Sequence, residues 1–205
     1  MGTVAAEETK SRIRAVAVEL FTTQGYEQTS LREIADRVGM TKASLYYHYP
    51  SKQALLQALI TPLLDEYRRT AQSCQALPHT PENVRWALGQ ILDVMIRNGS
   101  ACALMMRDVP AVLSAVAPVW EELITLSRQF NGWLAGPNPT DEDRIRALAA
   151  TETLGAAISA NMMMENLSEE TLRRTLLHCA VATLEAGTPH DQGVPQVVLT
   201  TTGTS

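Results

Sequence analysis

Helical spacing of apolar residues is the feature that most constrains the fold of this 205-residue chain. In the segment 31–38, apolar residues recur at i, i+3, i+4 and i+7, which places four of them on one face of a helix: Leu31, Ile34, Ala35 and Val38. Similar stripes recur along the chain, and the alternation typical of strands is scarce. Hydrophobic residues make up 45% of the sequence, which is enough for a sizeable core. The sequence therefore predicts an all-α protein.

Caps and helix breakers divide the chain into predicted helices. The first spans about 7–24 and ends at Gly25, because glycine readily adopts the left-handed conformation that follows a helix. Ser30 and Glu33 predict a reciprocal capping box at the start of the second helix. Thr41 is expected to cap a short third helix that ends before Pro50. Later helices are expected over about 52–76, 81–98 (ending at Gly99), 101–108, 119–135, 140–166 and 169–186.

Several classes of protein are disfavoured by what the sequence lacks. No apolar run approaches the ~18 residues of a membrane span, and the N-terminus has no apolar core of the signal-peptide kind. The three cysteines, Cys74, Cys102 and Cys179, lie far apart, which suits buried thiols in a reducing cytoplasm. We find no nucleophile elbow, phosphate loop, zinc motif or glycine fingerprint. We therefore expect a cytoplasmic protein that is not an enzyme and has no cofactor or metal.

Aromatic residues are concentrated in TKASLYYHYPSK, residues 41–52, although the whole chain is only 5% aromatic. A helix, a break at Gly39 and a second short helix form the helix-turn-helix arrangement, whose second helix enters the DNA major groove. At 100° per residue the outer face of that helix carries Ala43, Tyr46 and Tyr47, with Lys42 close by. The alternative is a solvated amphipathic helix end.

The residue types on this face match DNA chemistry. Lys42 can donate to guanine O6 and N7, and Ala43 can contact a thymine methyl group. Tyrosine hydroxyls, His48 and Lys52 suit phosphate oxygens, and the amides near Ser51 offer a further phosphate site. Residues 1–52 carry a net charge of +1 and the remainder −6, which also favours an anionic partner for the first segment.

Residues 10–56 resemble the DNA-binding domain of the TetR family of transcriptional regulators. The matching motifs are Gly25-Tyr26, Thr29-Ser30, Ile34-Ala35, Gly39, Leu45-Tyr46-Tyr47-His48-Tyr49 and Lys52, with Tyr49 where phenylalanine is usual. The resemblance covers about a quarter of the chain. It implies base contacts from Lys42, Ala43 and Tyr46 and phosphate contacts from other residues of the motif. The predicted DNA-binding set is Thr29, Ser30, Lys42, Ala43, Ser44, Tyr46, Tyr47, His48 and Lys52.

The resemblance also implies three regions and a homodimer. We expect a helix-turn-helix domain over 1–52, a helical ligand-binding and dimerisation domain over 53–187, and a flexible tail over 188–205. Small and apolar stripes over 147–160 and 172–184 are expected to pair with their copies across a two-fold axis.

Methionine and aromatic residues of the second domain are candidates for a ligand pocket, because methionine lines adaptable cavities. The predicted set is Trp86, Met95, Met105, Met106, Trp120, Phe130 and Met162. Ordinary core filling is the alternative for each of them. The composition favours a small, apolar or aromatic effector.

The resulting hypothesis is a repressor that a small effector releases from a palindromic operator on double-stranded DNA. A transcriptional activator would use the same DNA-binding residues, so the sequence leaves that alternative open. A helical ligand-binding protein that does not bind DNA is a further alternative, which the intact 42–52 stretch disfavours.

Overall fold

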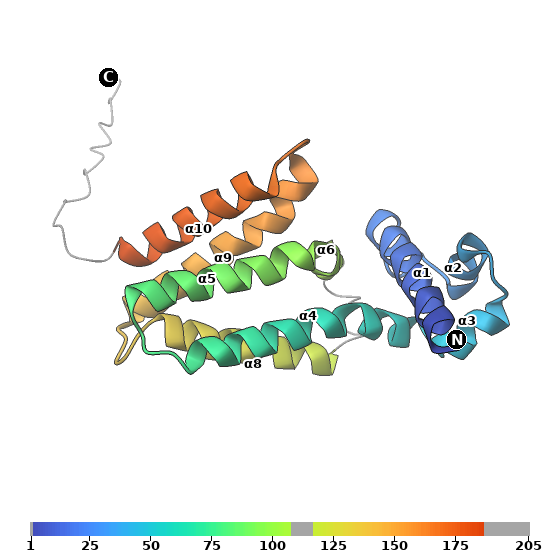
Figure 1. Cartoon of the computed structure of the whole chain (residues 1–205), viewed down its shortest axis with the longest axis horizontal. Coiled ribbons are helices and arrows are strands. Elements are labelled where there is room, and N and C mark those ends of the chain that lie inside the picture. The colour runs from blue at the N-terminus through green and yellow to red at the C-terminus, as the bar shows by residue number, and fades with distance from the viewer. Residues whose placement is uncertain (1, 108–116, 187–205) are drawn as a thin grey trace, which may run out of the picture.

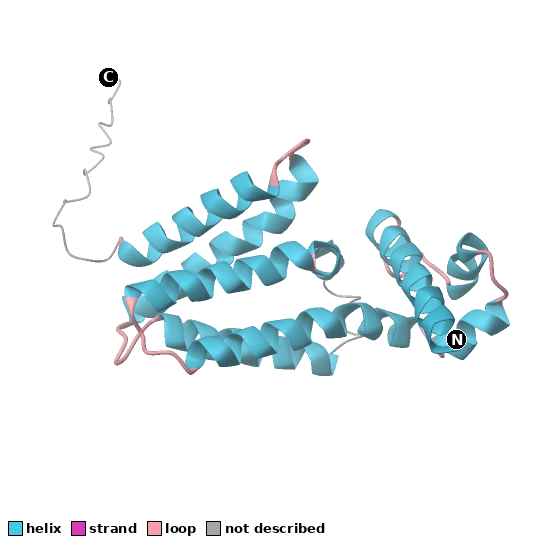
Figure 2. Cartoon of the chain, viewed as in Figure 1, coloured by secondary structure: helices cyan, strands magenta, loops and turns pink. Residues whose placement is uncertain are grey.

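The computed structural model describes residues 2–107 and 117–186. Within these ranges, the side chains of residues 2–5, 106–107, 118–120 and 161–162 lie outside the description, as do the predicted tail, 188–205, and the predicted helix stop at 187. Every regular element in the described ranges is an α-helix (Figure 2). This confirms the predicted all-α fold.

Three helices form a cluster at one end of the molecule: α1 (Gly2–Thr23), α2 (Leu31–Val38) and α3 (Lys42–His48) (Figure 1). Phe21, Ile34 and Leu45 are fully buried, one from each helix, so the three helices share one apolar core. The first helix begins at Gly2 rather than near residue 7, and it ends before Gly25, whose φ of 101° confirms the predicted stop.

The caps of α2 differ in one respect from the prediction. The Ser30 hydroxyl accepts the Glu33 amide at 3.1 Å, as expected for an N-cap. The Glu33 carboxylate, however, accepts a hydrogen bond from the Gln24 side chain at 2.9 Å. Glu33 therefore ties α2 to the end of α1 and does not complete the predicted box. A reciprocal capping box is instead present between Thr140 and Asp143.

The long helix α4 (Lys52–Gln75) leads away from this cluster and runs along the second group of helices (Figure 1). It passes through Pro62 without ending, although proline removes one backbone donor. Its 24 residues span about 36 Å at the usual rise per residue. Because α4 is continuous, a displacement of its far part can be transmitted to its first turn beside α3.

The second group contains α5 (Pro81–Arg97), α6 (Gly99–Arg107), α8 (Ala117–Leu134), α9 (Asp141–Met163) and α10 (Glu169–Glu185). Helix α4 packs against α5 and α8, and α9 packs against α5 and α10. The short helix α6 contacts α1 as well as α9, so it joins the two groups.

Two predicted helix ends in this group are wrong. Gly99 begins α6, because Asn98 has already ended α5 as its C-cap. Helix α9 ends at Met163 and not near 166, because Met164 is extended and Asn166 adopts a positive φ of 58°.

Ion pairs hold the helices of the second group to α4 and to one another. The Glu66 carboxylate of α4 accepts hydrogen bonds from Arg97 and, at 2.8 Å, from Asn98. Arg68 of α4 pairs with Glu122 of α8. Arg173 of α10 pairs with Asp93 of α5 at 2.6 Å; these contacts link helices that lie far apart in the sequence.

The cysteines only partly fit the expectation of buried thiols. Cys74 and Cys102 are buried, and this burial raises the pKa of each thiol to about 11. Cys179 on α10 is exposed, which corrects the prediction at that position. Among the described residues, no helix is long and apolar enough to cross a membrane, and no group of side chains could hold a metal ion.

Candidate nucleic-acid interface

Helix α3 presents a polar and aromatic face on the surface of the N-terminal cluster. Lys42, Ala43 and Ser44 are exposed in its first turn, and Tyr47 is 87% exposed. The Lys42 amine lies 5.5 Å from the centre of the Tyr46 ring. These side chains therefore face outward, as predicted.

The opposite face of α3 anchors the helix. Leu45 is fully buried and Tyr49 is 6% exposed, so apolar burial fixes the rotation of the helix about its axis. Thr41 caps the helix by accepting the Ser44 amide at 3.1 Å. Gly39 in the turn has a φ of +79°, a conformation that glycine adopts without strain and that lets α3 start in a new direction.

Aromatic and hydroxyl groups continue this surface beyond the first turn of α3. The rings of Tyr47 and His48 meet edge to face with centroids 5.6 Å apart. Ser51 caps α4 by accepting the Ala54 amide at 2.9 Å, so the N-terminus of α4 begins directly after α3. Backbone amides at such an N-terminus favour anions.

Two residues of the predicted set have partners inside the cluster. Thr29 is 2% exposed, and its hydroxyl donates to the Gly25 carbonyl at 2.8 Å. The Lys52 amine donates to the Tyr26 carbonyl at 2.8 Å and lies 4.3 Å from the centre of the Tyr26 ring. Both side chains therefore brace the turn between α1 and α2, and their phosphate contacts remain predictions. Ser30 is exposed, but its hydroxyl already caps α2.

Comparison with known proteins identifies the cluster. Residues 13–59 match the family model described as bacterial regulatory proteins, tetR family. This range contains α2, α3 and the first two turns of α4. The HTH-type transcriptional regulator RutR of Escherichia coli O157:H7 is 36% identical over 130 residues, which cover 61% of this chain and 61% of that protein. The N-terminal cluster therefore carries the domain that this tetR-family model describes.

Other transcriptional regulators are similar over different lengths. SrpR of Pseudomonas putida, also named an HTH-type transcriptional regulator, is 40% identical over 55 residues, or 27% of this chain and 26% of that protein. The match therefore spans about a quarter of SrpR. A solved transcriptional regulator of Aquifex aeolicus VF5 has a TM-score of 0.65 at 23% identity, covering 83% of this chain and 96% of that one. That likeness supports the fold over both groups of helices. The family consists of regulators and not of enzymes, as expected for this chain.

The described members of the predicted ligand-pocket set do not gather around one hollow. Phe130 is fully buried, Met105 is 7% exposed and Met95 is half-buried against the core. Trp86 is 45% exposed on α5. The side chains of Met106, Trp120 and Met162 lie outside the described part of the chain.

One hollow of the described surface is lined by other residues. It is a groove of about 610 Å³ between α8 and α9, lined by Leu123, Ile124, Ser127, Arg128, Asn131, Gly132, Arg144, Leu148 and Glu152. Sequence reasoning missed these residues because methionine and tryptophan content was its only guide. Ile124 and Leu148 are each part of an apolar helical stripe, and only the packing of α8 beside α9 brings the two stripes together.

Proposed function

We propose that this protein is a ligand-responsive, sequence-specific transcription regulator that acts as a repressor. One observation carries the proposal: α3 is anchored by buried Leu45 while its exposed face presents Lys42, Ala43, Tyr46 and Tyr47. A buried anchor and a polar outer face are what a helix needs in order to be held firmly in a DNA groove. Because its partner is DNA, we place the protein in the cytoplasm.

In this proposal, residues in the first half of α3 recognise the bases. Lys42 donates to a guanine edge, Ala43 contacts a thymine methyl group, and Tyr46 adds a hydroxyl. Tyr47, Ser44 and His48 bind phosphates, together with the amides at the start of α4. Thr29, Ser30 and Lys52 contribute chiefly by holding the cluster in shape, as their internal hydrogen bonds favour.

The regulator acts as a homodimer on a palindromic operator. Support comes from α9, where Ile145 is 66% exposed beside small residues such as Ala149 and Ala156. Such apolar surface is costly to leave in water, and two copies of α9 and α10 can cover it in a four-helix bundle. Two reading helices related by a two-fold axis require two half-sites.

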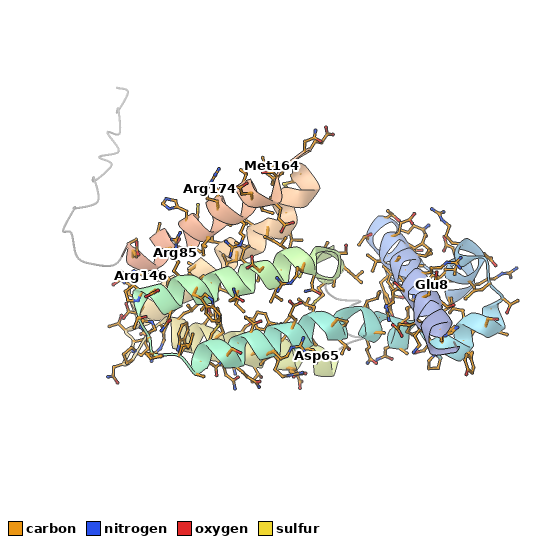
Figure 3. The ribbon with its side chains drawn as sticks, viewed as in Figure 1. Glu8, Asp65, Arg85, Arg146, Met164 and Arg174 are labelled. Atoms are coloured by element: carbon orange, nitrogen blue, oxygen red, sulfur yellow. The ribbon has the colours of Figure 1, made fainter. Side chains whose placement is uncertain are left out.

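A selection from a random duplex library tests the proposal. Purified full-length protein is incubated with the library at physiological salt, and the retained DNA is sequenced. We expect enrichment of a palindrome, since specific binders exceed their non-specific affinity by ~10³ or more. The Lys42→Ala variant should enrich an altered sequence at one position of each half-site. The Arg85→Ala variant is the control, because Arg85 is an exposed cation on α5, away from α3 (Figure 3).

Each result of the selection has a defined meaning. Enrichment of the same sequence by wild type and Lys42→Ala would show that α3 does not read bases as proposed. No enrichment by protein that has been unfolded, freed of bound molecules and refolded would favour a helical ligand-binding protein without DNA binding. A reporter gene downstream of the enriched site separates the remaining alternatives, because a repressor lowers its expression and an activator raises it.

A further inference from the structure

The groove between α8 and α9 combines apolar walls with charge at its rim. Leu123, Ile124 and Leu148 supply apolar side chains, whereas Arg128, Arg144 and Glu152 supply charged ones. The volume of about 610 Å³ lies in the range that small-molecule sites occupy, about 300–1,000 Å³. The groove therefore has the size and the mixed character of a site for an amphipathic small molecule.

Arg128 distinguishes this groove from the other hollows of the described surface. Arg146, at the hollow between α5 and α10, is paired with Glu142 and Asp143. Arg97, at the hollow between α1 and α4, is paired with Glu66. Arg128 is exposed and has no ion-pair partner among the residues that the structure describes.

Arg128 places its charge beside the apolar wall of the groove. It follows Ile124 by four residues on α8, so both side chains lie on the same face of the helix. Arg144, from α9, is a second cation, and it forms an ion pair with Asp141 at 2.9 Å. Because Asp141 already pairs with Arg144, Arg128 is the arginine that remains unpaired among the described lining residues, which also include one acid, Glu152.

We propose that this groove is the effector site and that its ligand is an amphipathic monocarboxylate. The carboxylate binds the Arg128 guanidinium, which can form two parallel hydrogen bonds with such a group. The apolar chain lies against Leu123, Ile124 and Leu148. This inference rests on the proposed function, because it names the effector of the proposed repressor.

The floor of the groove is connected to α4. The Ser127 hydroxyl lies 3.4 Å from the hydroxyl of Tyr67, at the long end of hydrogen-bond range, and Tyr67 is 4% exposed. Five residues earlier on α8, Glu122 pairs with Arg68, the residue that follows Tyr67 on α4. A ligand that shifts α8 therefore acts on α4, whose first turn follows α3. It can release DNA only by binding the DNA-free arrangement more tightly than the DNA-bound one.

Calorimetry with decanoate, and with decan-1-ol as its uncharged counterpart, tests the assignment on the full chain. We expect decanoate to bind wild type and Arg128→Gln to weaken that binding tenfold or more, which is about 1.4 kcal/mol. Decan-1-ol should bind both proteins equally and more weakly than decanoate binds wild type. The Arg174→Gln variant is the matched control, because Arg174 is an exposed arginine on α10, away from the groove (Figure 3).

Three outcomes would overturn the assignment. These are no binding of decanoate to wild type, an unchanged affinity of Arg128→Gln for decanoate, and an equal loss of affinity in Arg174→Gln. A second copy of this chain is the competing occupant, since Ile145 and Leu148 are exposed on the same helix. If decanoate binds only after Ile145→Glu has made the protein monomeric, the groove is a contact between copies and the assignment is wrong.

Retention of the selected DNA, measured with and without decanoate, separates this inference from the function on which it rests. Release of DNA from wild type but not from Arg128→Gln supports both. DNA that stays bound to decanoate-loaded protein overturns the effector role and leaves the regulator intact. If no DNA sequence is selected, the proposed function fails, and the affinities of wild type and Arg128→Gln still decide whether the groove is a carboxylate site.

Discussion

At the scale of single residues, Lys52 shows how a cation in a DNA-binding motif can face inward. Its amine donates to the carbonyls of Tyr26 at 2.8 Å and Glu27 at 3.3 Å. We expect Lys52→Met to lower the free energy of unfolding by about 1–2 kcal/mol, because two carbonyls lose a charged donor in a partly exposed setting. Urea unfolding followed by circular dichroism measures this change.

Lys42→Met provides the matched control for Lys52, because it removes the same charge from an exposed position on α3. Its free energy of unfolding should change by no more than about 0.5 kcal/mol. The salt dependence of DNA binding then decides the role of Lys52. A phosphate contact predicts that Lys52→Met lowers the slope of log affinity against log salt by about 1. An unchanged slope, with lowered stability, identifies Lys52 as a brace of the cluster.

At the scale of helices and turns, Gly39 controls the angle between α2 and α3. A Cβ atom at this position would meet nothing within 4 Å, so the cost of Gly39→Ala comes from its φ of +79° alone. We expect a loss of about 1–2 kcal/mol in the free energy of unfolding. Gly132→Ala is the control: Gly132 lies inside α8 with equally open space, and alanine there should stabilise the helix by up to about 1 kcal/mol. Equal effects of the two substitutions would contradict the conformational explanation.

At the scale of the whole molecule, Glu66 ties α4 to the junction of α5 and α6. Burial raises the pKa of Glu66, but hydrogen bonds from Asn98 and Arg97 outweigh burial and hold the pKa below its ordinary value. A carboxyl whose pKa is lowered by folding stabilises the fold above its unfolded pKa. That stabilisation is lost as the pH falls through the folded pKa.

The Glu66→Gln variant should therefore be less stable than wild type near neutral pH, by no more than about 1 kcal/mol for this partly exposed group. Its stability should fall less steeply as the pH drops through the acid range, about pH 5 to 3. Urea unfolding at several pH values measures both effects. Glu8→Gln, on an exposed part of α1 (Figure 3), should leave the pH profile unchanged. Parallel profiles for wild type and Glu66→Gln would contradict the proposed tie.

The proposed dimer also belongs to the scale of the whole molecule. We expect Ile145→Glu to convert a dimer into a monomer, because two carboxylates would be buried near the two-fold axis without partners. Light scattering at micromolar concentration measures the change. Glu142→Gln, one turn earlier on α9, should leave the mass unchanged. A monomeric wild-type protein would contradict the proposed dimer.

The sequence alone determined the helical class and the outward face of α3. These properties depend on neighbours within a few residues: the spacing of Leu31, Ile34 and Val38, the cap at Ser30 and the break at Gly39 all act locally. The cluster and its outward-facing residues could be predicted because local patterns determine which face of each helix is buried.

Only the tertiary structure decided which side chains meet across helices. The Glu33 carboxylate accepts a hydrogen bond from Gln24 and not from the N-terminus of its own helix. The Lys52 amine donates to the carbonyl of Glu27, which lies 25 residues earlier in the sequence. The groove between α8 and α9 likewise joins Arg128 to Leu148, and no spacing rule relates positions on two different helices. Such contacts follow from how helices pack, and packing depends on the shape and burial of the whole core.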